Sequence, residues 1–128
     1  MAKNKLKLTE HTKTWIIDLD GTILKHNGYL IDNTDTLLPG VKDFFLTKIK
    51  KGDYILIITA RKEEYREQTI EFLRKNGIRF NNIIFSAPKG ERIVINDTKP
   101  KGMATAYAIP VQRDIGLLGI DIVHQGKK

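Results

Sequence analysis

Apolar, β-branched runs alternate with stretches of helical spacing along the chain. Residues 13–19 and 53–59 each hold a continuous apolar run that ends in polar or glycine residues, which predicts two buried strands. Shorter runs at 82–85 and 92–96 predict a third and a fourth strand. Because the runs are apolar throughout rather than alternating, we expect a parallel sheet that is covered by helices.

Helical spacing separates these strands. One helix is expected from Pro39 to about residue 51, and a longer one at about 62–75, where Asn76-Gly77 supplies the C-terminal cap. Residues 21–38 are irregular and rich in turn formers. The resulting order of elements predicts an α/β fold.

The tail has a weaker pattern. Residues 101–109 fit either a helix or a strand, and 117–123 predict a final strand or an arm. We therefore expect residues 1–128 to form a single domain, with 104–128 as an arm or an extra element. This apolar tail also suits a subunit contact, although an added element on the domain's own sheet is the favoured interpretation.

Composition is typical of a globular protein. The 128 residues are 41% hydrophobic and 29% charged, and the absence of cysteine excludes disulfides and thiolate metal sites. No apolar run approaches the length of about 18 residues that a membrane span needs. The basic N-terminus lacks the apolar core of a secretory signal. We therefore expect a cytoplasmic protein without a membrane partner.

The net charge of +7, from 22 basic and 15 acidic residues, favours anionic partners such as phosphate esters. The basic residues are scattered and form no stripe with interleaved aromatic residues, so nucleic acid is the less favoured partner. The net charge therefore indicates an anionic partner but does not indicate a reaction.

Polar side chains close the predicted strands. Asp18 and Asp20 end the first, Thr59 ends the second, and Asn96 and Asp97 follow the fourth. Ligands of open α/β sheets bind beyond the carboxyl ends of the strands, so these residues predict one shared site.

Asp18 and Asp20 carry the most specific chemistry. Two carboxylates this close repel each other unless a cation compensates, and Mg²⁺ is the natural partner of oxygen ligands. One carboxylate can attack phosphorus to form an aspartyl-phosphate, while the other protonates the leaving oxygen and then activates water. In isolation, an Asp-x-Asp-Gly sequence is more often a solvated turn. The order of the later polar residues therefore matters.

That order resembles the haloacid dehalogenase superfamily, whose members are mostly phosphatases. Its four motifs are similar to residues 16–22 (Ile-Ile-Asp-Leu-Asp-Gly-Thr), residues 56–59 (Leu-Ile-Ile-Thr), Lys89, and Asn96-Asp97. The resemblance implies that Asp18 is the nucleophile and a Mg²⁺ ligand. It also implies that Asp20 is the general acid and base, with its backbone carbonyl on the metal. Asn96 stands where many members have a carboxylate, so whether Asn96 or Asp97 completes the metal shell stays open.

The resemblance also implies a phosphoryl-binding set, consisting of Thr59, Ala60 and Lys89. Arg61 directly follows Ala60 and is expected to contact the substrate, where its guanidinium would donate two hydrogen bonds to a phosphate or an acidic sugar. Together with Arg66 and Thr69 it is similar to a segment of some capless relatives. Arg66 itself is interpreted as part of a solvated helix face.

The spacing between the motifs leaves no room for a cap domain. Asp20 and Thr59 are separated by 38 residues, and Thr59 and Lys89 by 29, and core elements account for both intervals. We expect a three-layer Rossmann-like core with a mainly parallel sheet and no cap. A large substrate or a second subunit would then have to cover the open site, so a homo-oligomer is possible.

The predicted function is a Mg²⁺-dependent phosphatase with a small phosphorylated substrate. A sugar phosphate or related phosphomonoester of surface-polysaccharide metabolism is favoured, because residues 95–102 are similar to small superfamily members of capsule pathways. A polynucleotide end phosphatase and a non-catalytic scaffold of the same fold stay open as alternatives. Asn96 is the one feature that favours the scaffold.

Overall fold

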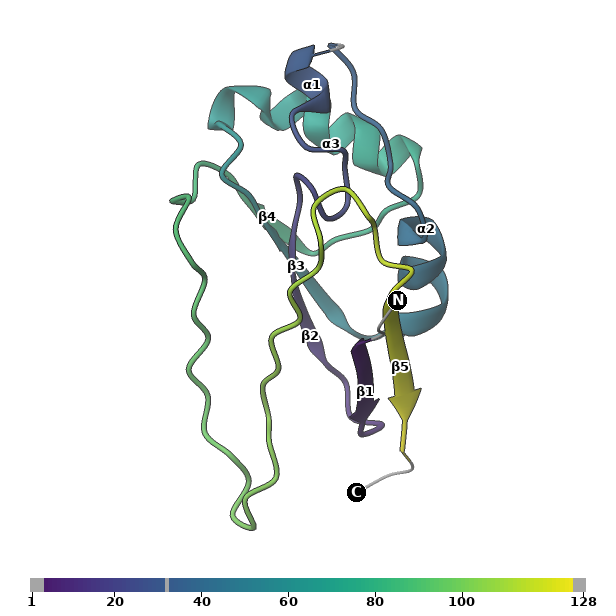
Figure 1. Cartoon of the computed structure of the whole chain (residues 1–128), viewed down its shortest axis with the longest axis vertical. Helices are drawn as coiled ribbons and strands as arrows, with labels where there is room; N and C mark the ends of the chain where they lie inside the picture. Colours follow the sequence, from purple (N-terminus) through teal and green to yellow (C-terminus); the bar gives the residue numbers. More distant parts are fainter. Residues whose placement is uncertain (1–3, 32, 126–128) are drawn as a thin grey trace.

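Parallel strands in two sheets form the frame of the molecule. The computed structural model of the chain describes residues 4–31 and 33–125, whose path is drawn in Figure 1. The larger sheet has the order β2 (Thr14–Asp18), β3 (Tyr54–Ile58) and β4 (Asn82–Ile84). All of its pairs are parallel. The predicted α/β class is confirmed, and so are the first three predicted strands.

A second sheet joins the two ends of the described chain. β1 (Asn4–Leu8), which the sequence pattern did not predict, pairs in parallel with β5 (Ile120–His124). Leu117 and Ile122 are buried in the core from this side. The expected single sheet is therefore divided into two, and residues 120–124 of the tail belong to the chain's own fold.

Helices pack against one face of the larger sheet, whereas on its other face Ile16 and Ile84 are 51% and 43% exposed. The predicted long helix is present as the 3₁₀ turn η2 (Glu63–Tyr65) followed by α3 (Arg66–Lys75). Thr69 and Leu73 are its buried residues. A short helix in the irregular segment, α1 (Gly28–Ile31), was not predicted, and its Tyr29 ring packs against that of Tyr65 in η2 at 4.8 Å. Within the described residues, no helix has the length and apolar content needed to cross a membrane.

The helix expected from Pro39 is shorter and has a wider turn. α2 (Val41–Asp43) continues into the π-helix η1 (Phe44–Lys48), where Ile49 N–H donates to the Phe44 carbonyl at 3.2 Å. The two consecutive phenylalanines, Phe44 and Phe45, are both buried. Trp15 is partly buried against the core and packs edge-on against Phe44, with ring centroids 5.6 Å apart.

Residues 88–110, which we call the arm, leave the body of the protein as two extended lengths joined by a tight turn (Figure 1). The fourth strand predicted at 92–96 and the regular element predicted at 101–109 are both wrong, because neither range is helix or strand. Ile93 and Ile95 are 79% and 92% exposed.

The physical reason is the lack of a partner backbone. An apolar run forms a strand only where a neighbouring strand supplies hydrogen bonds and cover. In the described part of the chain, β2 pairs with β3 alone, and the arm's backbone hydrogen bonds are local ones at its tip, between Lys99 and Met103 and between Gly102 and Lys99.

No cap domain is evident among the described residues, as expected from the motif spacing. The segments on either side of β3 hold only the short helices and strands named above. The carboxyl ends of the three strands of the larger sheet therefore stay uncovered by a separate domain.

Asp53 joins the two chain segments that lead into β2 and β3. Its buried carboxylate accepts hydrogen bonds from Lys13 N at 3.0 Å, Lys50 N at 2.9 Å and Trp15 Nε1 at 2.8 Å. Burial by itself raises the pKa of Asp53, but these hydrogen bonds outweigh burial and hold the pKa below its ordinary value.

We predict that Asp53→Asn lowers the free energy of unfolding by about 2 kcal/mol at pH 7, because charge-assisted hydrogen bonds to buried donors are lost. The pKa of Asp53 is lower in the folded protein than in the unfolded chain. Its contribution is therefore complete above the unfolded value, about 3.9, and is lost as the pH falls through the folded value. Urea unfolding at pH 7 and pH 3 measures the difference, with exposed Asp43→Asn as the control. If the difference in unfolding free energy between the parent protein and Asp53→Asn were the same at both pH values, the lowered pKa of Asp53 would be contradicted.

Candidate active site

Asp18 is the last residue of β2 and presents an accessible carboxylate. Its side chain is 38% exposed, and Arg92 Nη1 from the arm donates to Oδ1 at 2.7 Å. Thr22 Oγ1 donates to Oδ2 at 3.0 Å. Gly21 has the left-handed φ of 89° that glycine adopts without strain, and this turn returns Thr22 to Asp18. The carboxylate is therefore oriented on one oxygen and paired with a cation on the other.

Asp20 lies two residues further on and is more enclosed, with its side chain 15% exposed. Thr59, the buried residue that follows β3, donates its hydroxyl to Asp20 Oδ2 at 3.2 Å. The same hydroxyl accepts a hydrogen bond from the Arg61 backbone N–H at 2.9 Å. The ends of β2 and β3 thus bring Asp20 and Thr59 together.

The Arg61 side chain is 0% exposed and lies between two carboxylates. Nη2 donates to Asp20 Oδ1 at 2.6 Å and Nε donates to Asp20 Oδ2 at 3.3 Å. Nη1 and Nη2 donate to the two oxygens of Asp35 at 3.1 and 2.9 Å. Nη1 also donates to Thr69 Oγ1 at 2.7 Å, and the guanidinium carbon lies 3.8 Å from the Tyr29 ring centroid. A guanidinium has five N–H donors, and these five hydrogen bonds use all of them.

Arg61 is therefore placed differently from the expectation that it contacts substrate. A buried guanidinium with every donor engaged by Asp20, Asp35 and Thr69 has none left for a phosphate. The arginine was visible in the sequence, but its burial was not. Asp35 lies within residues 21–38, which the sequence pattern predicts only to be irregular.

The charges in this network alter two pKa values. Burial by itself lowers the pKa of Arg61, but hydrogen bonds to Asp35 and Asp20 outweigh it and raise the pKa above its ordinary value. Burial raises the pKa of the Tyr29 hydroxyl, and the nearby Asp20 carboxylate raises it further. Arg61 therefore stays protonated over the whole working pH range.

The structure does not bring the predicted fourth-motif residues to Asp18. Asn96 and Asp97 are exposed on the arm. Asn96 Nδ2 donates to Thr105 Oγ1 at 2.8 Å, and the Thr105 hydroxyl donates to the Asp97 carbonyl, so these contacts join the two lengths of the arm. Lys89 is exposed near the start of the arm. The cation that contacts Asp18 is Arg92, which the sequence analysis did not single out.

Of the predicted phosphoryl-binding residues, Thr59 and Ala60 lie together directly after β3. Ala60 is half-buried, and the Thr59 backbone N–H donates to the Ile84 carbonyl at 2.9 Å. Among the described residues, no group of three or more His, Cys, Asp or Glu side chains could hold a metal ion.

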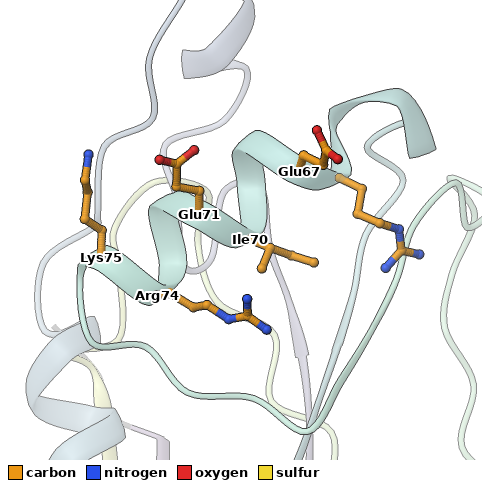
Figure 2. Close-up of a pocket in the computed structure, with 6 residues that line it drawn as sticks. Glu67, Ile70, Glu71, Arg74 and Lys75 are labelled. Carbon is orange, nitrogen blue, oxygen red and sulfur yellow. The ribbon is translucent and has the colours of Figure 1, made fainter.

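A hollow lies along α3, and its lining is shown in Figure 2. It is lined by Arg66, Glu67, Ile70, Glu71, Arg74 and Lys75. Arg66 pairs with Glu63 and its guanidinium lies 4.8 Å from the Phe85 ring centroid. The mixed charges confirm the interpretation of Arg66 as part of a solvated helix face.

Comparisons with known proteins support the fold more than the chemistry. No family model matches the sequence, and no curated protein matches it. Among solved structures, the chain is similar to a chain in the "Structure of Pnkp1/Rnl/Hen1 complex", with 27% sequence identity and a TM-score of 0.51. The match covers 66% of this chain and 31% of that one, so this chain spans about a third of that neighbour's length.

The two arginines that pair with aspartates, Arg61 and Arg92, should differ sharply in their effect on stability. We predict that Arg61→Met lowers the free energy of unfolding by about 3–5 kcal/mol, because it leaves the Asp20 and Asp35 carboxylates uncompensated in a buried position. Arg92→Met removes an exposed pair and should change stability by no more than about 1 kcal/mol. Urea unfolding of both variants at pH 7 measures the difference. Equal losses would contradict the contrast in burial.

Proposed function

We propose that the protein is a phosphatase that hydrolyses phosphomonoesters through an aspartyl-phosphate on Asp18. The observation that carries the proposal is the pair of unlike carboxylates at the carboxyl end of β2. Asp18 is accessible and oriented by Thr22, whereas Asp20 is enclosed by Thr59 and Arg61. Two carboxylates in different environments can divide nucleophilic and acid–base roles.

Asp18 suits the nucleophile because it is open to solvent and one of its oxygens is held by the Thr22 hydroxyl. A carboxylate approached by an anionic phosphate is repelled, and the guanidinium of Arg92 beside Asp18 offsets this repulsion. In the proposed step an Asp18 oxygen attacks phosphorus, the ester P–O bond breaks, and the leaving oxygen carries away the electron pair.

Asp20 is the proposed general acid and base. In its protonated form it donates a proton to the leaving oxygen, so that an alcohol departs. The resulting carboxylate then takes a proton from water as that water attacks the phosphorus of the aspartyl-phosphate. Inorganic phosphate leaves, Asp18 is regenerated as a carboxylate and Asp20 regains its proton. Thr59, Ala60 and Lys89 are the proposed phosphoryl-binding residues, and the Thr59 hydroxyl would exchange its hydrogen bond to Asp20 for one to the phosphoryl group.

Magnesium is the cofactor that the resemblance to haloacid dehalogenase phosphatases implies. Asp18 offers the oxygen ligands that Mg²⁺ prefers. The described residues nevertheless lack a cluster of three metal-binding side chains, and Asn96 and Asp97 lie on the arm. The residues as arranged therefore do not complete a site for the ion, and the steps above use only the chain's own groups. A Mg²⁺ requirement stays a prediction of the resemblance.

The proposed substrate is a small phosphomonoester, with a sugar phosphate of surface-polysaccharide metabolism favoured by the resemblance. A phosphorylated polynucleotide end is the second candidate. The charge of the arm favours this second candidate, because basic side chains outnumber acidic ones on its exposed or partly exposed surface. The four basic residues are Lys89, Arg92, Lys99 and Lys101, and the two acidic ones are Glu91 and Asp97. The similarity to a chain of the Pnkp1/Rnl/Hen1 complex adds support.

We predict that the protein hydrolyses p-nitrophenyl phosphate and that Asp18→Asn lowers kcat at least about 1,000-fold, because the amide cannot act as the nucleophile. Asp43→Asn makes the same chemical change at an exposed helix position and should retain full activity. Released nitrophenolate is measured with Mg²⁺ and after EDTA treatment. An active Asp18→Asn variant, or no turnover by the parent, would contradict the proposal and favour the scaffold. Equal rates with Mg²⁺ and EDTA would contradict only the metal requirement.

The substrate class is tested by a panel of sugar phosphates beside oligonucleotides with a 3′ or a 5′ phosphate. We expect sugar phosphates to have the higher kcat/KM, measured as phosphate released, because the resemblance of residues 95–102 to small phosphatases of capsule pathways favours them. For an oligonucleotide substrate, KM should rise steeply with added salt because basic side chains contact the phosphates. Turnover of oligonucleotides alone would overturn the sugar-phosphate assignment.

A further inference from the structure

We propose that Arg61, held by Asp35, positions the carboxylate of Asp20 for proton transfer. This inference rests on the proposed function, because it assumes that Asp20 is the general acid and base. Arg61 then acts by holding Asp20 in place, and it does not contact the substrate itself. The inference also gives a role to Asp35, which lies 26 residues away from Arg61 in the chain.

Arg61 and Thr59 hold Asp20 in a way that leaves one oxygen available. Oδ2 accepts hydrogen bonds from Thr59 Oγ1 and Arg61 Nε, whereas Oδ1 accepts one from Arg61 Nη2. Each carboxylate oxygen has two lone pairs, so Oδ1 keeps an acceptor position for the proton. The Asp20 side chain keeps 15% exposure, so it is not closed off from solvent.

The guanidinium is itself fixed on several sides. Asp35 accepts from both terminal nitrogens on one edge, Thr69 accepts a further hydrogen bond, and the Tyr29 ring covers a face at 3.8 Å. A bidentate fork that is held in this way defines the plane of the Asp20 carboxylate as well as its position. Since the pKa of Arg61 is raised, its charge does not titrate during turnover.

The competing explanation is a purely structural one, in which Arg61 only joins the segments that carry Asp20, Asp35 and Thr69. The two explanations differ in how the rate depends on the leaving group. A basic leaving oxygen needs the proton that Asp20 donates, whereas a weakly basic one departs without it. Because kcat/KM reports the steps up to departure of the leaving group, a misplaced Asp20 lowers kcat/KM chiefly for the first kind of ester, whereas a generally loosened fold lowers it for both.

The test compares kcat/KM for phenyl phosphate, which has a basic leaving oxygen, with that for 2,4-dinitrophenyl phosphate. Arg61→Lys keeps the charge and loses the fork. We expect it to lower kcat/KM about 100-fold for phenyl phosphate and less than about 10-fold for the dinitrophenyl ester. Asp53→Asn is the matched control, because it removes buried hydrogen bonds away from Asp20 and should affect both esters equally.

Asp35→Asn provides a second variant, so that the test does not depend on the folding of Arg61→Lys. This variant keeps the hydrogen bonds between Arg61 and Asp20 but weakens those between Arg61 and residue 35. We expect it to lower kcat/KM selectively for phenyl phosphate, by about 10-fold. Equal losses for both esters in the folded variants would overturn the positioning role and leave the phosphatase proposal intact. No Asp18-dependent turnover of either ester by the parent protein would instead overturn the proposed function, and this inference with it.

Discussion

The buried guanidinium of Arg61 is the constraint around which the candidate site is organised. A cation without solvent is tolerated only when its partners are complete, and here Asp20, Asp35 and Thr69 accept all five of its hydrogen bonds. Those partners come from the turn after β2, the connection that follows α1, and α3. One side chain therefore requires three separate segments to meet at the end of the larger sheet.

This arrangement makes two nearby carboxylates chemically unlike. Asp20 is enclosed by Arg61 and Thr59, so its direction is set by groups that substrate does not reach. Asp18 is 38% exposed, and among the described residues its side chain accepts hydrogen bonds from Thr22 and the exposed Arg92. An open carboxylate beside an enclosed one is the combination that an attack on phosphorus followed by proton transfer requires. The uncapped sheet edge leaves that combination accessible.

Elements that depend on local sequence were predicted, whereas elements that depend on partners far away in the chain were not. β2, β3, β4 and α3 were predicted because local apolar runs and helical spacing determine them. The arm was predicted wrongly from the same kind of signal. Its β-branched residues have strand propensity, but in the described chain no backbone hydrogen bond joins them to the edge of β2. β1 was missed because its partner, β5, lies at the other end of the chain.

The sequence by itself determined that Asp18, Asp20 and Thr59 lie at or just after the ends of strands, and therefore that they lie at one edge of a parallel sheet. It showed an arginine at position 61 but not whether that arginine faces solvent. Only the tertiary structure decided this, because burial and hydrogen-bond partners depend on residues that meet through folding: Asp20 lies 41 positions before Arg61 and Asp35 lies 26 before it. The same long-range packing placed Arg92, rather than Asn96 or Asp97, beside Asp18.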